Sequence, residues 1–254
     1  MKILLLLGTV LAYVTTLTSF SAHAVAVSGQ GTWETTLQGR DLDGNAATFE
    51  AWYDTTLDIT WLADANAAGT PMTWIDAKTW AAELDVNGIT GWRLPTVCPV
   101  NGSSFNTTLS PDGTTDRGSA TTTTDGSDGG WRDGSDTPVS EMGHMFYVTL
   151  GNIGACDPTL PWCTHPTGWG LSNTGLFTGL QADRYWFSTE FDSMNARYLH
   201  FNEGIQNNLP NSSSLFAWAV RSGDISAVPV PAAAWLFGSG LLGLIGIARR
   251  KQAA

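Results

Sequence analysis

Apolar residues at helical spacing mark one clear helix in the first half of the chain. They fall on one face of a helix at Trp74, Ala77, Ala81 and Leu84. Thr73 precedes this face and Asp76 follows three residues later, which is the arrangement of a capping box at a helix N-terminus. Asn87-Gly88 supplies a stop, so we predict a helix that begins after Thr73 and ends at that pair.

A second helix is predicted over residues 140–150. Its apolar side chains recur at every fourth position, Met142, Phe146 and Leu150, and Gly151 follows as a stop. Between the two helices lies a polar stretch, residues 101–136, with aspartates at positions Asp112, Asp116, Asp125, Asp128, Asp133 and Asp136. We interpret this stretch as a solvated insertion or mobile loop, with a cation held by its aspartates as the less favoured alternative.

Strand patterns flank the helices. Residues 32–37 and 48–53 are predicted to form a hairpin around a turn rich in Asp, Gly and Asn. Three further strands are expected to form an antiparallel meander, residues 184–189, 197–201 and 215–220. The last of these is apolar on both faces, which suggests a central position in its sheet. Together with the two helices, the strands predict an α+β fold.

The turn of the first hairpin also has a partial metal-binding pattern. Asp41, Asp43 and Asn45 have the odd-position spacing of a calcium loop. However, Trp52 stands where such a loop needs a bidentate carboxylate. A plain hairpin turn is therefore favoured, and calcium remains the weaker reading. No other cofactor is expected.

The N-terminal end has the pattern of a secretory signal peptide, residues 1–24. Lys2 supplies a positive charge, residues 3–14 are an apolar run, and Ala22-His23-Ala24 provides small residues at the cleavage positions. A retained membrane helix is the alternative. We expect a mature extracellular domain that begins at residue 25 and extends to residue 227.

The C-terminal end has three parts. Val228-Pro229-Val230-Pro231 breaks any preceding strand, residues 232–248 are uncharged, and Arg249, Arg250 and Lys251 follow. Seventeen residues lie at the short limit for a helix that crosses roughly 30 Å of hydrocarbon. We therefore predict a C-terminal transmembrane helix over 232–248, with the basic residues on the cytoplasmic side.

Composition narrows the class of protein. Charged residues make up only 14% of the chain and there are 12 tryptophans, which favours a loop-rich and β-rich extracellular domain. The formal net charge is −11, and the region between the two ends keeps 8 bases against 23 acids, or −15. Such a domain repels nucleic acids and anionic membranes. The acidic excess is interpreted as a source of solubility rather than as a cation site.

Cysteines and candidate catalytic groups complete the chemistry. Cys156 and Cys163 flank a proline-containing loop and are predicted to pair in an oxidising compartment, with two unpaired thiols as the alternative. Cys98 is then the odd cysteine. We find no complete catalytic motif, which favours a non-enzymatic protein. Glu190 and Glu203 stay open as a pair of carboxylates for an enzyme that acts on polysaccharide.

Residues 228–251 resemble the PEP-CTERM sorting signal of Gram-negative bacteria. The three-part arrangement matches, although Val-Pro-Val-Pro lacks the glutamate of the family name. The resemblance implies tethering to the inner membrane, recognition by an exosortase and cleavage near the proline motif. It also implies delivery to the cell surface or extracellular matrix, often together with exopolysaccharide. A permanent membrane anchor is the alternative.

A second resemblance covers residues 49–223. Its pieces are Ile59 to Leu62, Thr73-Trp74 with Asp76-Ala77, Gly91-Trp92-Arg93-Leu94-Pro95-Thr96, Tyr185-Trp186-Phe187-Ser188-Thr189-Glu190, and Ala219 to Gly223, which includes Arg221. Their order and spacing resemble the Lcl C-terminal domain family, a domain of unknown function grouped with C-type-lectin-like folds. Phe187 departs from the small residue or serine usual in that family.

The resemblance implies a C-type-lectin-like domain, and the motif residues are interpreted as structural. Trp92 is expected in the core, Arg93 is expected to bridge loops, and Arg221 is expected to do likewise. Stacking of exposed tryptophans on sugar rings is the alternative. The sequence thus predicts an exported protein whose partners are the export machinery, an exosortase and a glycan or other matrix component. An enzyme and a purely structural matrix protein stay as alternatives.

Overall fold

The computed structural model describes residues 30–45, 47–119, 140–157 and 163–225. The predicted signal peptide with Ala22 and Ala24, the sorting motif from Val228 to Lys251 and the predicted helix over 232–248 lie outside these ranges. Among the residues within them, no helix is both long enough and apolar enough to cross a membrane.

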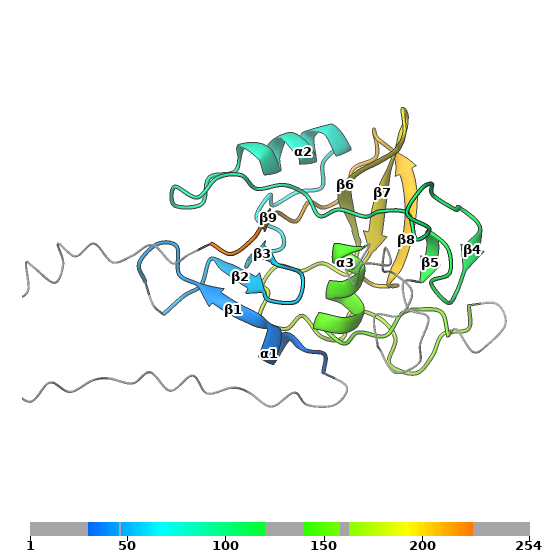
Figure 1. The fold of residues 1–254 in the computed structure, drawn as a ribbon, viewed down its shortest axis with the longest axis horizontal. Coiled ribbons are helices and arrows are strands. Elements are labelled where there is room, and N and C mark those ends of the chain that lie inside the picture. The colour runs from blue at the N-terminus through cyan, green and yellow to red at the C-terminus, as the bar shows by residue number, and fades with distance from the viewer. Residues whose placement is uncertain (1–29, 46, 120–139, 158–162, 226–254) are drawn as a thin grey trace, which may run out of the picture.

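A four-stranded antiparallel sheet has the strand order β1-β2-β3-β9 (Figure 1). Its strands are β1 (Leu37–Arg40), β2 (Ala51–Asp54), β3 (Ile59–Leu62) and β9 (Val220–Ser222). The predicted hairpin is confirmed as β1 and β2, but its first strand begins at Leu37 rather than at residue 32. Residues 33–36 form a short helix, α1 (Trp33–Thr36), because the carbonyl of Thr32 accepts hydrogen bonds from the amides of Thr35 and Thr36.

A five-stranded sheet has the order β4-β5-β8-β7-β6. Its strands are β4 (Leu109–Ser110), β5 (Arg117–Ser119), β6 (Arg184–Asp192), β7 (Asn195–His200) and β8 (Ile205–Pro210). Only the β4–β5 pair is parallel. The strands predicted at 184–189 and 197–201 are confirmed as β6 and β7.

The prediction of residues 215–220 as the third strand of the meander was wrong. β8 takes that place, and the apolar segment 215–219 instead crosses the core with isolated bridges from Leu215 to Met72 and from Phe216 to Tyr185. Its end joins the other sheet as β9, where Val220 lies between Trp61 of β3 and Arg93. The segment is apolar on both sides because core surrounds it, and the pattern alone does not distinguish that from a central strand.

The first predicted helix is confirmed as α2 (Trp74–Glu83). The amide of Asp76 donates to Thr73 Oγ1 at 3.4 Å, and the Thr73 hydroxyl donates to Asp76 Oδ2 at 2.6 Å. The helix ends at Glu83, four residues before the predicted stop. Asn87 and Gly88 have positive φ and form the turn of a small bridge instead.

The second predicted helix is confirmed as α3 (Glu141–His144), which continues as a π-helical turn, η1 (Met145–Thr149). Ser140 caps it by accepting a hydrogen bond from the amide of Gly143 at 3.0 Å. The three apolar positions that carried the prediction are fully buried, namely Met142, Phe146 and Leu150.

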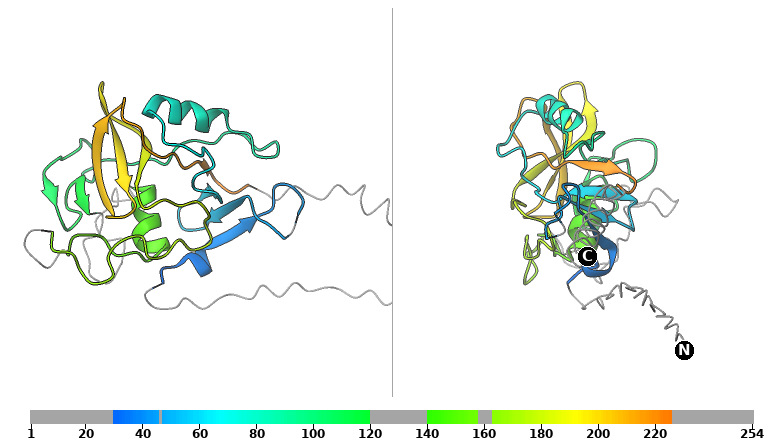
Figure 2. Two further views of the ribbon diagram at one scale, coloured as in Figure 1. Left: turned by 180° about the vertical axis from the view of Figure 1, so that it is seen from behind. Right: turned by 90° about the vertical axis from the view of Figure 1, so that its left-hand side faces the viewer.

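Two apolar clusters hold these elements together. The larger lies between the two sheets and α3–η1, with aromatic contacts around Trp218. The smaller lies on the other face of the five-stranded sheet, where α2 packs on Trp186, Ala196 and Tyr198. Figure 2 shows from behind that α2 runs along one end of this sheet while α3 lies at the other end. The predicted α+β class is confirmed.

The polar stretch between the helices is only partly a solvated loop. Asp116 is fully buried, and its carboxylate accepts hydrogen bonds from the amides of Val100 at 2.8 Å and Asn106 at 2.7 Å. The buried Arg197 guanidinium donates to the Asp116 carbonyl. Burial lowers the pKa of Arg197 to about 10, while the Asp116 carboxylate opposes that shift. The aspartates from Asp125 onward lie outside the described residues.

Candidate functional site

The motif residue Arg93 ties two parts of the fold together. Its guanidinium forms a bidentate ion pair with Glu141 of α3, with both N–O distances at 2.8 Å. The amide of Thr96 donates to the same carboxylate at 2.6 Å. Arg93 thus bridges the loop after Trp92 to the start of α3, as the sequence predicted.

The two longest motif pieces lie side by side. The carbonyl of Pro95 accepts from the amide of Ser188 at 2.8 Å, and the Thr189 hydroxyl donates to the carbonyl of Val97 at 2.9 Å. Six side chains of these two pieces are buried, those of Trp92, Leu94, Pro95, Tyr185, Trp186 and Phe187. Arg221 Nε donates to the carbonyl of Thr90 at 3.0 Å. These contacts fit a structural role.

Two alternatives from the sequence do not fit the geometry: tryptophans that stack on sugars, and a catalytic pair of Glu190 and Glu203. Every tryptophan in the described ranges is buried or half-buried, so their rings mainly pack in the core. Glu190 pairs with Ala196 near the start of β7, whereas Glu203 follows the end of that strand. The two carboxylates therefore lie at opposite ends of β7 and do not form a catalytic pair.

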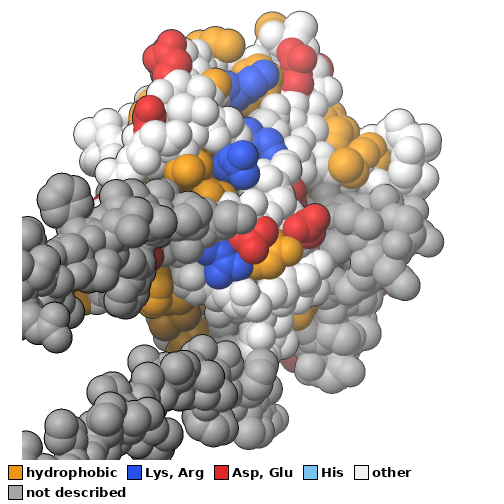
Figure 3. All heavy atoms as spheres, turned by 60° about the vertical axis from the view of Figure 1, so that its left-hand side comes forward, with side chains coloured by type: hydrophobic (Ala, Val, Ile, Leu, Met, Phe, Trp, Pro, Cys, Tyr) orange, Lys and Arg blue, Asp and Glu red, His pale blue; other side chains and the backbone are white. Residues whose placement is uncertain are grey.

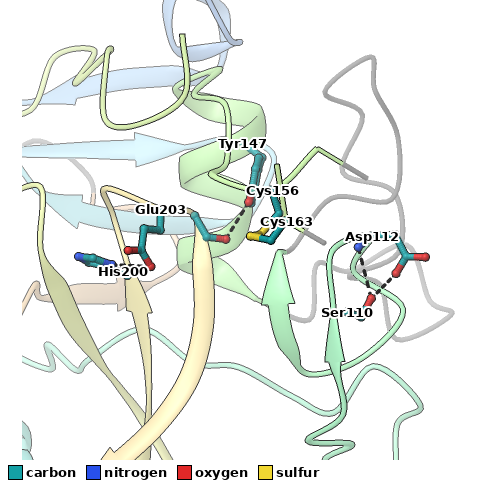
Figure 4. The surroundings of a disulfide bond; sticks show 8 residues. Ser110, Asp112, Tyr147, Cys156, Cys163, His200 and Glu203 are labelled. Carbon is teal, nitrogen blue, oxygen red and sulfur yellow. Dashed lines mark hydrogen bonds and ion pairs between the residues drawn. A yellow bond between two sulfur atoms is a disulfide. The ribbon is translucent and has the colours of Figure 1, made fainter. Parts of the chain in front are cut away.

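The predicted disulfide between Cys156 and Cys163 is present. Figure 4 shows it with Tyr147, whose hydroxyl donates to the carbonyl of Gly204 at 2.7 Å. The third cysteine, Cys98, is exposed.

The acidic turn of the first hairpin is explained by its own hydrogen bonds. Carboxylate oxygens of Asp41, Asp43 and Glu50 lie within 4.8 Å of one another. Asp41 accepts from the amide of Gly44 at 2.7 Å, and Glu50 accepts from the amide of Leu42 at 2.8 Å. The amide of Asn45 donates to Asp43 Oδ1 at 2.7 Å, so these side chains satisfy the turn's own backbone.

The outer face of the five-stranded sheet contains a more distinctive group of polar side chains. Cross-strand partners point to the same face of a sheet, so Arg184 lies beside His200, and Tyr198 lies beside Asn207. Helix α2 covers this face only from Trp186 onward, next to the small apolar cluster. The rest of the face is not covered by α2.

We call this part, together with Tyr198 at the border of the small apolar cluster, the polar ledge. It consists of Arg117, Arg184, Tyr198, His200, Glu203 and Asn207. Arg117 belongs to it because it is two residues before Ser119, which pairs with Ile205 on this face. Arg117 and Arg184 are exposed, while Asn207 is half-buried.

Tyr198 lies at the centre of the polar ledge. The Arg184 guanidinium lies 5.8 Å from the centre of its ring, and Asn207 is its cross-strand partner on β8. Burial raises the pKa of Tyr198, and the positive charge of Arg184 works against that shift. The phenol therefore stays neutral and offers a donor as well as an acceptor near pH 7.

A second pair lies at the edge of the polar ledge. His200 Nδ1 and Glu203 Oε2 are 3.0 Å apart, and Figure 4 shows the two side chains facing each other. The carbonyl of Glu203 accepts from the amide of Ala155, which brings the disulfide loop alongside. The other described histidines lie elsewhere. His144 is buried in α3, and the ring of His165 contacts that of Trp169.

A cavity of about 330 Å³ lies between β4 and the disulfide. Among the described residues, those that line it are Leu109, Ser110, Pro111, Cys156 and Cys163. Leu109 is the register partner of Arg117, so the cavity adjoins the β4 side of the polar ledge. Its walls are mostly apolar, which suits the less polar face of a ligand rather than a metal ion.

Other basic groups in the described part of the chain are engaged. Arg40 pairs with Asp224 at 2.6 Å, and Arg197 is buried. Figure 3 shows basic side chains close to acidic and hydrophobic ones on one face of the molecule. Arg117 and Arg184 are exposed, and among the residues that the structure describes neither forms an ion pair with a carboxylate, as is also true of the exposed Lys78 beside Trp74.

Sequence reasoning missed most of the polar ledge. Asn207 lies on β8, which was not predicted, and Tyr198 and Arg184 were seen only as strand residues. The available signal was the polar segment after His200, which the strand pattern did not explain. No protein-family model, curated protein or solved structure matches the chain.

Proposed function

We propose that this chain is an exported, non-enzymatic protein of the cell surface or extracellular matrix that binds a glycan through the polar ledge. The observation that carries the proposal is the half-covered outer face of the five-stranded sheet. There the exposed guanidinium of Arg184, the half-buried amide of Asn207, the phenol of Tyr198 and a His–Glu pair lie on one face of the sheet. Groups that donate and accept in fixed positions suit a ligand rich in hydroxyl groups.

Export is proposed from the two ends of the sequence. We propose removal of residues 1–24, and recognition of residues 228–251 by an exosortase after insertion of the 232–248 helix. The disulfide between Cys156 and Cys163 supports an oxidising compartment. Release into a matrix containing exopolysaccharide would then bring the polar ledge to its ligand.

We further propose membership of the Lcl C-terminal family and a C-type-lectin-like arrangement of residues 49–223. Hydrogen bonds that join the motif segment Arg93 to Val97 with Ser188 and Thr189 support this proposal. They explain why both pieces would occur together in one sequence pattern. No calcium or other cofactor is part of the proposal.

The test combines location with binding. The full-length chain, carrying an epitope tag between β6 and β7, should appear at the cell surface or in the matrix, with a shorter C-terminus than its precursor. Purified in detergent, it should bind at least one polysaccharide in a panel of neutral and acidic polymers, without degrading it. Retention in the cytoplasm would contradict export, and a panel without any binding would contradict glycan recognition.

A further inference from the structure

We infer that the polar ledge binds an uncharged glycan and needs no metal ion to do so, an inference that rests on the proposed function. The first step concerns shape. Arg184, Tyr198 and Asn207 lie on three neighbouring strands and form an oblique row that crosses two strand spacings of about 4.8 Å, because Arg184 pairs with His200 and is therefore diagonal to Tyr198. That row suits an extended chain of sugar units better than a single small molecule.

The second step concerns hydrogen bonding. The Arg184 guanidinium has five N–H donors, and the Asn207 amide offers donors and an acceptor. Tyr198 is only 8% exposed and the Arg184 guanidinium lies 5.8 Å from the centre of its ring, so a ligand meets the guanidinium rather than the open face of the ring. Neighbouring hydroxyls of a sugar can donate to and accept from such groups at once, whereas a carboxylate can only accept.

The third step concerns charge. Two carboxylates lie near the two arginines in the chain or on the ledge without forming an ion pair with them: Glu203 is held by His200, and the exposed Asp183 accepts the backbone amide of Arg184. The site is thus close to neutral, within a protein whose net charge is −11. A long polyanion would be repelled by the rest of the molecule. An uncharged polymer does not meet this repulsion.

The fourth step concerns metal. Calcium takes six to eight oxygen ligands. The polar ledge itself has one carboxylate, that of Glu203, and this group is already paired with His200 at 3.0 Å. Direct hydrogen bonds from side chains therefore have to supply the affinity.

The experiment measures binding of the detergent-solubilised full-length chain to immobilised dextran, an uncharged β-glucan and a polyuronate, each with calcium and with EDTA. We expect binding to one of the uncharged polymers in both conditions, with little dependence on salt. Arg184→Met and Asn207→Ala should each weaken it by roughly tenfold. Arg221→Met, a change of similar size on β9 in the other sheet, should leave binding unchanged.

Folding and binding are separated by recording thermal unfolding of each variant, because a variant that retains the parent's unfolding temperature has lost only contacts. Stronger binding to the polyuronate, or binding abolished by EDTA, would overturn this inference but leave the proposed function standing. Uncharged-polymer binding that both ledge variants retain would place the site elsewhere and also overturn it. Absence of binding to all three polymers would overturn the inference and count against the proposed function.

Discussion

The Glu141 carboxylate accepts three hydrogen bonds, two from the Arg93 guanidinium and one from the amide of Thr96. The side chains are 29% and 13% exposed, so water screens the pair only in part. We expect Glu141→Gln to lower the free energy of unfolding by about 1.5–3 kcal/mol, the range for hydrogen bonds to charged groups. Chemical denaturation measures this loss.

Glu83→Gln is the matched control, because Glu83 is exposed at the end of α2 and makes the same chemical change. It should shift stability by less than about 0.5 kcal/mol. Equal losses in the two variants would mean that the ion pair contributes little beyond a surface charge.

The buried carboxyl of Asp54 makes the stability of the fold depend on pH. Burial raises its pKa above the ordinary value of 3.8, although the nearby His144 and the amides of Thr56 and Leu57 oppose the shift. The folded protein therefore binds this proton more readily than the unfolded chain, and the stability gained from it is lost as the pH rises through the folded pKa. We expect Asp54→Asn to remove that part of the decline, measured by urea denaturation from about pH 3.5 to 7.

Asp192 provides a contrast of opposite sign. The amides of Met194 and Asn195, together with the Asn195 side chain, lower the pKa of this exposed carboxyl. Its stabilising contribution is present above the ordinary pKa and is lost as the pH falls through the folded pKa. Asp192→Asn should therefore flatten the acid side of the profile, and the same response in both variants would refute the assignment.

At the scale of elements, α2 depends on its first turn. Thr73 accepts the amide of Asp76, which otherwise has no partner within the helix. Thr73→Ala should cost about 1 kcal/mol of unfolding free energy in chemical denaturation. Thr79→Ala, in the middle of the same helix and exposed, should have a clearly smaller effect.

Helices α2 and α3 could be predicted from the sequence because their signals are local: caps, stops and apolar positions occur within a few residues of each other. β8 was missed since Gln206, Asn207 and Asn208 give it no apolar alternation, and its pairing with β7 is what holds it. The bridging role of Arg93 was predicted from its chemistry. Its partner was not, because Glu141 is 48 positions away and no local pattern connects them.

At the scale of the whole molecule, the disulfide closes a short loop beside the polar ledge. Replacing both Cys156 and Cys163 by Ser should lower the free energy of unfolding by about 2–3 kcal/mol, if loop entropy in the unfolded chain dominates. Urea denaturation with and without a reductant measures this. The double variant should no longer respond to the reductant, whereas Cys98→Ser should respond as the parent does.

Helix α2 covers only one end of the outer sheet face, and that division separates two kinds of evolutionary freedom. Substitutions under the helix disturb packing and are quickly lost, whereas substitutions at exposed positions such as Arg117 and Arg184 cost the fold little. Ligand preference can therefore drift, or be redirected by a randomised library, while the same framework persists. A family built on this framework would share its interior and differ most in what it recognises.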